Sequence, residues 1–486
     1  MDPSRNIQKN HNFSAAKHFC NFILILGFIL YLIYILLPNH PCCYSFTIFT
    51  HLRPKLLSHN NNNSNYHSSS TNITHLVFGI ASSTRTWRIK KSYTESWWQP
   101  NITRGYVFLD KISGNLLPWP NSSPPFIISK DTNSKYKNYD KHPIPQTIRM
   151  TRMILELFEA ENEDVRWYIL SDDDTVFFVN NLVEVLEKYD HNKYFYIGMN
   201  SETFSANIFH SFDMGFGGGG FVLSYPLARA LVSNLDLCIK RYPTLYGSDH
   251  MVQSCVADLG VSLTPEKGFH QIDLHNDISG FLSAHPQSPV VSLHHFEAFD
   301  PIFPSMNRNE AIKHLMKAAK ADESRLLQQT ICYHKPKNWS FSISWGYSTQ
   351  IYESIYPPSF LQKPLQTFIP WNKLARPFYI IDTRLMPSNK NPCQLPHFFY
   401  LDSLEEIDGG IISASYIRRN PRRLPACSSS GSYFAGNITR ILVISPVKKH
   451  IDPVGSRRDC CDIKYEAGLN VTEIKIRTCF EDEIIP

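Results

Sequence analysis

The chain has 486 residues, of which 43% are hydrophobic and 13% aromatic, so it is long enough for two or three globular domains. Its formal net charge at pH 7 is only +5, and no dense block of lysine and arginine occurs along it. This weak and evenly spread charge excludes the basic patch that is typical of nucleic-acid-binding proteins.

A long uncharged segment near the N-terminus predicts a membrane anchor. Phe19–Leu37 has nineteen residues and no charge, which at about 1.5 Å per residue is enough to cross the ~30 Å hydrocarbon layer. Three cations precede it within residues 1–18, whereas the first cation after it is Arg53, so the N-terminal tail is expected in the cytosol. A cleaved signal peptide is the alternative, although no A-x-A site follows the run. The pattern predicts a single-pass type II membrane protein with a lumenal body.

Cysteines and glycosylation sequons agree with a body in the secretory pathway. Eight of the eleven cysteines lie beyond residue 72, an even number in a compartment that permits disulfides. Cys238 and Cys255 fall on adjacent predicted helices and are expected to pair, whereas the other pairings cannot be deduced. Seven Asn-x-Ser/Thr sequons follow the anchor, at Asn62, Asn72, Asn101, Asn121, Asn338, Asn437 and Asn470.

Residues 51–72 are polar and rich in Asn and Ser, which predicts a flexible stem over residues 38–71. Beyond it strand-like and helix-like patterns alternate, and this order predicts an α/β sheet with helices on both faces over residues 72–308. The expected strands are 75–80, 105–109, 126–129, 165–170, 175–179, 194–197 and 221–224. The expected helices are 87–98, 145–160, 181–189 with Asn180 as its cap, 226–242 and 248–259.

Residues 309–486 have a different character. A helix is expected at 309–328, and short strand-like runs separated by Pro, Gly and Asn follow it. These runs are WSFSISWGYSTQIYESIY, FYIIDTR, RILVISP and NVTEIKIRT. The pattern predicts a β-rich C-terminal accessory domain.

The stretch WYILSDDDTVFF at 167–178 carries the strongest chemical signal. An apolar strand ends in three successive carboxylates, Asp172, Asp173 and Asp174. Adjacent carboxylates repel one another, so a divalent cation such as Mg²⁺ or Mn²⁺, carrying a substrate's phosphates, is the expected counter-ion. Alternation along a strand would place Asp172 and Asp174 on one face and Asp173 on the other. An acidic turn without a metal is the alternative.

With this stretch, an ordered series of motifs resembles the fringe and β1,3-galactosyltransferase type of glycosyltransferase, most closely the plant fringe-related proteins with an extra C-terminal domain. The resemblance spans roughly residues 75–400. It implies a GT-A fold, which is a Rossmann-like nucleotide-sugar-binding sheet, with a nucleotide-sugar donor, Mn²⁺, inversion at the sugar carbon and a place in the Golgi membrane. The motifs are HLVFGIASS, FGGGGFVLSYPLA, RYPTLYGSDHMVQSCVADLG, GFHQID, ISWGYSTQIY and NPCQLPHFFY.

The resemblance implies roles for particular residues. Asp174 is expected to bind the metal, Asp172 to bind it directly or through water, and Asp173 to reach the ribose or a neighbouring backbone group. His270 in GFHQ corresponds to a third metal ligand, and imidazole suits Mn²⁺ better than Mg²⁺. Without the resemblance, the expected place of His270 is a loop near the surface, and that alternative stays open.

Asp249 matches the family's general base, which removes the proton of the acceptor hydroxyl. The alternative is an ordinary helix-start residue that interacts favourably with the helix dipole. The chain departs from the family at the next position, where His250 replaces the second acidic residue that commonly follows. This departure bears on acceptor preference and on the pKa of the base.

Two further motifs are candidates for the walls of the site. The glycine run at 217–220 lacks the G-x-x-x-x-G-K-[ST] pattern, so a P-loop is excluded. Gly219 and Gly220 resemble the family's contact with the donor sugar, and a simple turn or bulge is the alternative. His294 and His295 are candidates for the far wall, although tandem histidines in a loop are usually structural.

The sequence therefore predicts a metal-dependent inverting glycosyltransferase of the Golgi. It would transfer a hexose or N-acetylhexosamine from a uridine diphosphate (UDP) sugar to a glycan, glycoprotein or glycolipid, with a β1,3 linkage expected. One alternative is a catalytically silent carbohydrate-binding relative that scaffolds other transferases as a homo- or hetero-oligomer. Another is a metal-dependent phosphohydrolase, which usually holds two metals about 3.5–4 Å apart and is disfavoured by the single acidic cluster.

Overall fold

The computed structural model describes residues 25–28, 70–130, 146–161, 163–285, 288–387, 391–407, 409–448, 457–466 and 468–485. The chain divides into two units, Met1–His67 and Ser68–Pro486. The second unit contains all the hydrophobic clusters and disulfides found among the described residues. Because it holds its own core, we expect a protein that begins at Ser68 to fold independently.

The N-terminal predictions concern residues that are mostly not described. The predicted cytosolic tail, the stem up to residue 69 and the anchor apart from residues 25–28 lie outside the described residues. Among the residues that are described, no helix has the length and apolar character that crossing a bilayer requires.

Helices and strands alternate in the first part of the second unit, and strands dominate from Gln329 onward. The helices are α2 (Thr84–Glu95), α3 (Gln146–Ala160), α4 (Val179–Glu187), α5 (Phe204–Phe209), α6 (Tyr225–Arg241), α7 (Ser248–Ala257), α8 (Ser279–Leu282), α9 (Arg308–Ala321) and α10 (Pro358–Leu361). The strands up to α9 are β1 (Leu76–Ala81), β2 (Arg104–Leu109), β3 (Phe126–Ile128), β4 (Trp167–Asp172), β5 (Val176–Phe177), β6 (Tyr196–Gly198), β7 (Phe221–Ser224), β8 (Leu263–Pro265), β9 (Phe269–His270), β10 (Leu274–Asn276) and β11 (Ser292–Leu293). The strands after α9 are β12 (Gln329–His334), β13 (Trp339–Ser344), β14 (Ser348–Tyr352), β15 (Phe368–Pro370), β16 (His397–Ile407), β17 (Ile411–Ile417), β18 (Arg440–Pro446), β19 (Cys460–Tyr465) and β20 (Val471–Arg477).

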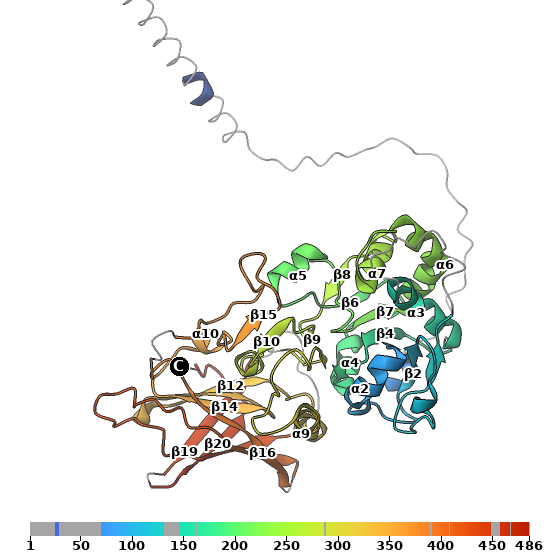
Figure 1. Cartoon of the computed structure of the whole chain (residues 1–486). Helices are drawn as coiled ribbons and strands as arrows, with labels where there is room; N and C mark the ends of the chain where they lie inside the picture. The colour runs from blue at the N-terminus through green and yellow to red at the C-terminus, as the bar shows by residue number, and fades with distance from the viewer. Residues whose placement is uncertain are drawn as a thin grey trace, which may run out of the picture. The chain divides into compact units, whose positions relative to one another are not determined.

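Within the described residues, seven strands form a mixed sheet in the order β3-β2-β1-β4-β7-β6-β8, which we name the main sheet (Figure 1). β1 pairs in parallel with β2 and β4, and β4 pairs antiparallel with β7. Side chains of β4 alternate between two cores: Trp167 and Ile169 pack with α2 and α4, and Tyr168 and Leu170 pack with α3, α6 and α7. Helices therefore cover both faces, and the predicted α/β sheet is confirmed.

A small sheet in the order β5-β11-β9 follows directly from the end of β4 in the described residues. β11 pairs antiparallel with β5 and in parallel with β9. In this register Leu293 lies opposite both Val176 and His270. The small sheet thereby brings the chain around residues 270 and 294 to the turn that contains the acidic triplet.

The C-terminal region is β-rich, as predicted. Its described strands form a sheet in the order β12-β13-β14-β16-β17-β18-β20-β19, in which β18 and β20 pair in parallel and the other neighbours pair antiparallel. The hydrophobic cluster that contains Trp167 of the main sheet continues to Trp345 and Tyr416 in this region. β10 also pairs with β15, so residues on the two sides of the predicted boundary at 308 share both a core and a strand pair.

One predicted strand is not formed. The run FYIIDTR at 378–384 contributes two isolated bridges among the described residues, Tyr379 with Thr203 and Arg384 with Leu365. N of Ile380 also donates to the carbonyl of Glu202. This contact ties the C-terminal region to the segment after β6, but it is too short for a strand.

Several predicted helix ends differ from the structure, and the helix expected at 87–98 is observed as α2 at Thr84–Glu95. The helix expected at 309–328 ends at Ala321, the last residue of α9. α4 begins at Val179 with Phe178 as its N-cap residue and no side-chain cap. Asn180 therefore lies inside the helix and does not cap it.

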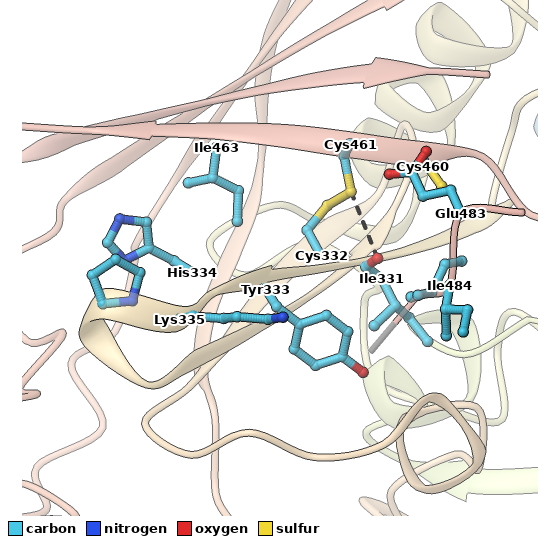
Figure 2. Close-up of a pocket in the computed structure, with 12 residues that line it drawn as sticks. Ile331, Cys332, Tyr333, His334, Lys335, Cys460, Cys461, Ile463, Glu483 and Ile484 are labelled. Carbon is cyan, nitrogen blue, oxygen red and sulfur yellow. Dashed lines mark hydrogen bonds between the residues drawn. A yellow bond between two sulfur atoms is a disulfide. The ribbon is translucent and has the colours of Figure 1, made fainter. Parts of the chain in front are cut away.

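The eight cysteines of the described residues form four disulfides. The predicted pair Cys238–Cys255 is confirmed and joins α6 to α7. Cys332–Cys461 joins β12 to β19 beside a pocket of about 400 Å³, where Sγ of Cys461 faces the carbonyl oxygen of Ile331 (Figure 2). The remaining pairs are Cys393–Cys427 and Cys460–Cys479.

Candidate functional site

The acidic triplet lies at the carboxyl end of β4. The strand ends at Asp172, and Asp173 and Asp174 form the turn that leads into β5. The parallel neighbour β1 ends at the same level, because Ala81 pairs with Asp172. Ligands of α/β sheets bind outside the carboxyl ends of strands, so the triplet occupies the expected place for a binding site.

His294 forms a group of three possible metal ligands with Asp172 and Asp174. Nε2 of His294 lies 3.2 Å from Oδ1 of Asp174 and 3.9 Å from Oδ2 of Asp172. Ligand atoms of the three residues all lie within 4.8 Å of one another. Asp174 and His294 are buried and Asp172 is partly exposed, so the group can be reached from solvent on the Asp172 side. We name these three residues the acid–histidine group.

The ring of His294 is oriented by its neighbours. Nδ1 lies 3.2 Å from the carbonyl oxygen of Gln271, and since a carbonyl can only accept, Nδ1 donates. Nε2 is then the nitrogen that faces the carboxylates, as in metal-binding histidines that donate through their other nitrogen. Gly218 makes this position possible, because a Cβ there would lie 2.1 Å from Cε1 of His294.

The glycines that were predicted to contact a donor sugar are buried against other parts of the chain. N of Gly219 donates to Oε1 of Gln271 at 2.8 Å. A Cβ on Gly220 would lie 2.8 Å from Cζ of Phe177, and its φ of 84° favours glycine. Gly217 is the partly exposed member of the run, so its backbone is the better candidate for a ligand contact.

Lys90 of α2 supplies a positive charge to the triplet. Its Nζ lies 2.9 Å from Oδ2 of Asp174 and 3.9 Å from Oδ1 of Asp173. The sequence predicted that a bound divalent cation neutralises the three carboxylates. The structure corrects this in part, because the chain itself places a cation there.

The three carboxyl groups differ in how well the chain stabilises their charge. Burial alone would raise the pKa of Asp174, but ion pairs and hydrogen bonds with His294 and Lys90 hold that pKa below its ordinary value. Burial raises the pKa of Asp172 to about 7, and repulsion from Asp174 and Asp173 acts in the same direction while His294 opposes it. The chain's own cations therefore stabilise Asp174 and leave Asp172 short of positive charge.

Asp173 is separated from the acid–histidine group. Its Oδ2 accepts a hydrogen bond from Oγ of Ser82 at 2.6 Å, and its carbonyl accepts one from Thr94 at 3.1 Å. The predicted grouping of Asp172 with Asp174 is therefore observed. A turn produces it, rather than the alternation of a strand.

His270, the predicted third ligand, is not brought to Asp172 and Asp174. Its Nδ1 lies 3.1 Å from Oε1 of Glu202, and its Nε2 lies 2.8 Å from Nε2 of His285. Both ring nitrogens are thus engaged by other side chains, and burial lowers the pKa of His270 to about 4. The residue is buried, so it is not a surface-loop histidine either. The physical reason for the difference is the position of His294, which occupies the place next to the carboxylates.

Asp249 lies in the first turn of α7, close to the triplet. Its Oδ2 accepts from N of Gly217 at 3.1 Å, and its Oδ1 accepts from N of His250 at 3.0 Å. Asp249, Gly217 and Asp172 line one small cavity of about 30 Å³. The structure therefore places the predicted base and a predicted metal ligand around the same small space.

Aromatic side chains gather beside this candidate base. Phe209 and Tyr246 are 62% and 49% exposed, and their ring centroids lie 5.8 Å apart. The ring of His210 lies 6.1 Å from that of Tyr246 and 5.7 Å from that of His250. A Cβ on Gly247 would contact both His210 and Oδ1 of the base, which places these rings next to the carboxylate. We name Phe209, His210, Tyr246 and His250 the aromatic surface.

A stack of rings connects the acid–histidine group to the C-terminal region. The ring of His295 lies 3.9 Å from that of His294 and 4.8 Å from that of Trp371, which in turn stacks on His275 at 4.5 Å. N of Trp371 donates to the carbonyl of Asp273 at 2.8 Å, and Nδ1 of His295 lies 3.3 Å from Oδ1 of Asp273. The tandem histidines therefore divide two roles, because His294 faces the acids and His295 packs on Trp371.

Lys90 and the aromatic surface were not predicted from the sequence, and His294 was predicted only as part of the far wall. The signal for His294 was present in the motif SLHHFE, since a neutral imidazole is a common metal ligand. No local pattern marks Lys90, which is one of two adjacent lysines on a helix.

We expect the acid–histidine group to bind Mn²⁺. In a protein of residues 68–486, His294→Asn and Asp174→Asn should each weaken Mn²⁺ binding at least about tenfold, because each removes a ligand atom. His270→Asn, a matched change of another buried histidine, should leave the affinity unchanged. Electron paramagnetic resonance of free Mn²⁺ during titration measures the affinity, and melting temperatures verify folding. Equal losses for the two histidine variants would contradict the assignment.

The family whose description reads "Protein of unknown function, DUF604" matches residues 206–461, just over half of the chain. A search of curated proteins finds no match. Solved structures that match include the mannosyltransferase PcManGT from Pyrobaculum calidifontis in complex with GDP-Man and Mn²⁺, and mouse xyloside xylosyltransferase 1 in its apo form.

The mannosyltransferase is 7% identical, with a TM-score of 0.25 over 53% of this chain and 64% of its own, so the match spans less than two thirds of that protein. The xylosyltransferase is 10% identical, with a TM-score of 0.25 over 42% of this chain and 85% of its own. At these TM-scores neither likeness carries an inference about activity, donor or metal.

Proposed function

Because the chain belongs to the DUF604 family, whose function is unknown, we propose from its site that it is a metal-dependent glycosyltransferase with a nucleotide-sugar donor. In its finer form the proposal is a GT-A-type enzyme that transfers a hexose or N-acetylhexosamine from a UDP-sugar, with inversion and a β1,3 linkage. The acceptor is a hydroxyl of a glycan, glycoprotein or glycolipid. One observation carries the proposal: Asp172, a member of the acid–histidine group at the end of β4, lines the same small cavity as Asp249.

The ligand atoms of the acid–histidine group fit a divalent cation. Two carboxylates and one imidazole suit Mn²⁺, and Asp172, Asp174 and His294 would hold it. When bound, such an ion supplies Lewis-acid stabilisation of a diphosphate leaving group. The carboxyl of Asp172, whose charge the chain stabilises least, gains most from an added positive charge. In this proposal His294 replaces His270 as the third ligand.

Lys90 supports the same site from α2. Its ammonium group lies against Asp174 and is partly exposed, so it adds a positive charge beside the place where a diphosphate would lie. It also holds the carboxylate of Asp174 in position through a direct ion pair. Both effects favour binding of an anionic donor.

Asp249 is the proposed general base. Two backbone N–H groups hold its carboxylate oxygens, which fixes the orientation of the group, and the residue remains partly exposed to an approaching hydroxyl. A base in this role takes the hydroxyl proton as the new bond forms and contributes about 10²–10⁴ in rate. The aromatic surface beside it offers apolar faces and imidazole nitrogens, which suit the C–H faces and hydroxyls of a sugar acceptor.

We propose the Golgi lumen as the place of action, with the chain anchored as a single-pass type II protein. The uncharged run at 19–37, the sequons and the four disulfides of the described residues support a lumenal body.

Donor hydrolysis over a panel of UDP-sugars with Mn²⁺ tests the activity. Residues 68–486 should release UDP from at least one donor, and Asp249→Asn should slow this release by about 10²–10⁴ while Mn²⁺ and UDP binding persist. Asp174→Asn should lose binding and hydrolysis together. Asp258→Asn changes a carboxylate at the other end of α7, where it pairs with Arg241 and accepts from Tyr242, and as the matched control it should release UDP as the wild type does.

Two outcomes of this assay would replace the proposal. Background release that is equal in the wild type and all variants, together with glycan binding, would identify a silent carbohydrate-binding protein. Phosphate release from simple esters would identify a phosphohydrolase.

The aromatic surface predicts a separate effect on the acceptor. With the best glycoside acceptor from a panel, Phe209→Ala and Tyr246→Ala should each raise the acceptor KM several-fold. Hydrolysis by water should be unchanged, because water needs no sugar contact. Phe480→Ala, another exposed phenylalanine, is the control. An unchanged KM in both variants, or an equal fall in hydrolysis, would exclude this surface from acceptor binding.

A further inference from the structure

A cavity of about 620 Å³ is lined by both residues of β9, Phe269 and His270. Its walls come from residues 199–202, 267–270 and 281–284 and, in the C-terminal region, from residues 359–364 and 380–382. The volume is that of a small-molecule site, for which about 300–1,000 Å³ is usual. We name it the apolar cavity. Asp172, Asp174, His294 and Asp249 do not line it, so it is distinct from the proposed transfer site.

The interior of the apolar cavity is hydrophobic. Phe269, Phe281 and Ala284 form its buried part, and Ile380 and Ile381 add apolar surface from the C-terminal region. Deeply buried apolar walls of this size gain free energy when an apolar molecule displaces water from them.

Two titratable groups, Glu202 and His270, lie in the interior, and burial acts against the charged form of each. Burial raises the pKa of Glu202 to about 7 and lowers that of His270 to about 4, so both shifts favour the neutral forms. Nδ1 of His270 lies 3.1 Å from Oε1 of Glu202, and N of Ile272 donates to Oε2 of Glu202, so both groups are engaged within the wall. The interior is therefore suited to an uncharged part of a molecule.

The mouth of the cavity is charged, in contrast to its interior. Nζ of Lys363 lies 3.1 Å from Oδ2 of Asp382, so these two charges offset one another. Lys267 is exposed and makes no ion pair with any residue that the structure describes. The mouth thus carries one unpaired positive charge beside an apolar interior.

We propose that the apolar cavity binds a small amphiphile whose apolar chain or ring system fills the interior and whose anionic head group pairs with Lys267. The volume of the cavity, its apolar lining and the positive charge at its mouth all match this class of ligand. The proposal holds whether or not the transfer activity is present, because it depends on none of the residues of the acid–histidine group.

A fluorescence titration with 8-anilinonaphthalene-1-sulfonate, which joins an aromatic body to a sulfonate, tests the proposal on residues 68–486. The probe should bind saturably at one site, and dodecanoate should displace it. Dodecyltrimethylammonium, with the same chain length and the opposite charge, should not. No displacement by dodecanoate, or equal displacement by both amphiphiles, would overturn the proposal.

Two substitutions locate the site. Lys267→Glu should weaken dodecanoate about tenfold, since it replaces attraction at the mouth by repulsion, and Ile381→Asp should abolish binding by placing a charge in the apolar wall. Lys313→Glu, at an exposed lysine of α9, is the matched control and should bind as the wild type does. Lys267 is exposed, so its replacement spares the core even if Ile381→Asp does not fold. Wild-type affinity in Lys267→Glu would overturn the proposal.

Discussion

Three adjacent carboxylates at the end of a buried strand are the constraint that organises this molecule. A carboxylate that is removed from water costs several kcal/mol unless a partner charge or hydrogen bonds compensate it. Neighbouring residues compensate part of this cost. Lys90 and His294 pair with Asp174, and Ser82 donates to Asp173. Burial raises the pKa of Asp172 to about 7 and also raises that of Asp173, but Asp172 is the one of the three that is partly exposed. The negative charge that the chain compensates least therefore faces solvent. This is where a cation carried by an anionic substrate would enter.

The position of His294 depends on segments from the whole second unit. Gly218 leaves space for its ring, the carbonyl of Gln271 accepts a hydrogen bond from its Nδ1, and His295 stacks on Trp371 from the C-terminal region. The C-terminal region therefore supports the candidate metal ligand as well as enclosing the apolar cavity. The pairing of β10 with β15 gives a physical reason for this support, because Trp371 directly follows β15 and contacts Asp273, His275 of β10 and His295.

Sequence patterns predicted the local features well. The alternation of Trp167, Tyr168, Ile169 and Leu170 between two cores follows from the period of a strand, and the break at the triplet marks where the strand ends. The pair Cys238–Cys255 was predictable because adjacent helices carry both cysteines. These features depend on residues that are close in the sequence.

The choice between His270 and His294 was not predictable in the same way. Both follow short apolar runs, and they lie on the parallel strand pair β9–β11, where His270 is opposite Leu293 and His294 is one residue beyond. Side chains of successive residues point to opposite faces, so a shift of one residue decides which histidine meets the acids and which one lies in the wall of the apolar cavity. The register between β9 and β11 determines which histidine meets the acids, and local sequence does not show that register. The contact of Lys90 with Asp174 is likewise formed by residues far apart in the chain. Trp371 lies beside His295 because β15 pairs with β10, which is also distant in the sequence.

The central claim is that Asp172, Asp174 and His294 together hold a divalent cation. Crystals of residues 68–486 grown with Mn²⁺ and UDP, measured at the manganese absorption edge, test it most directly. The account predicts an anomalous peak in contact with both carboxylates and Nε2 of His294. A peak at His270, or none near the end of β4, would contradict it.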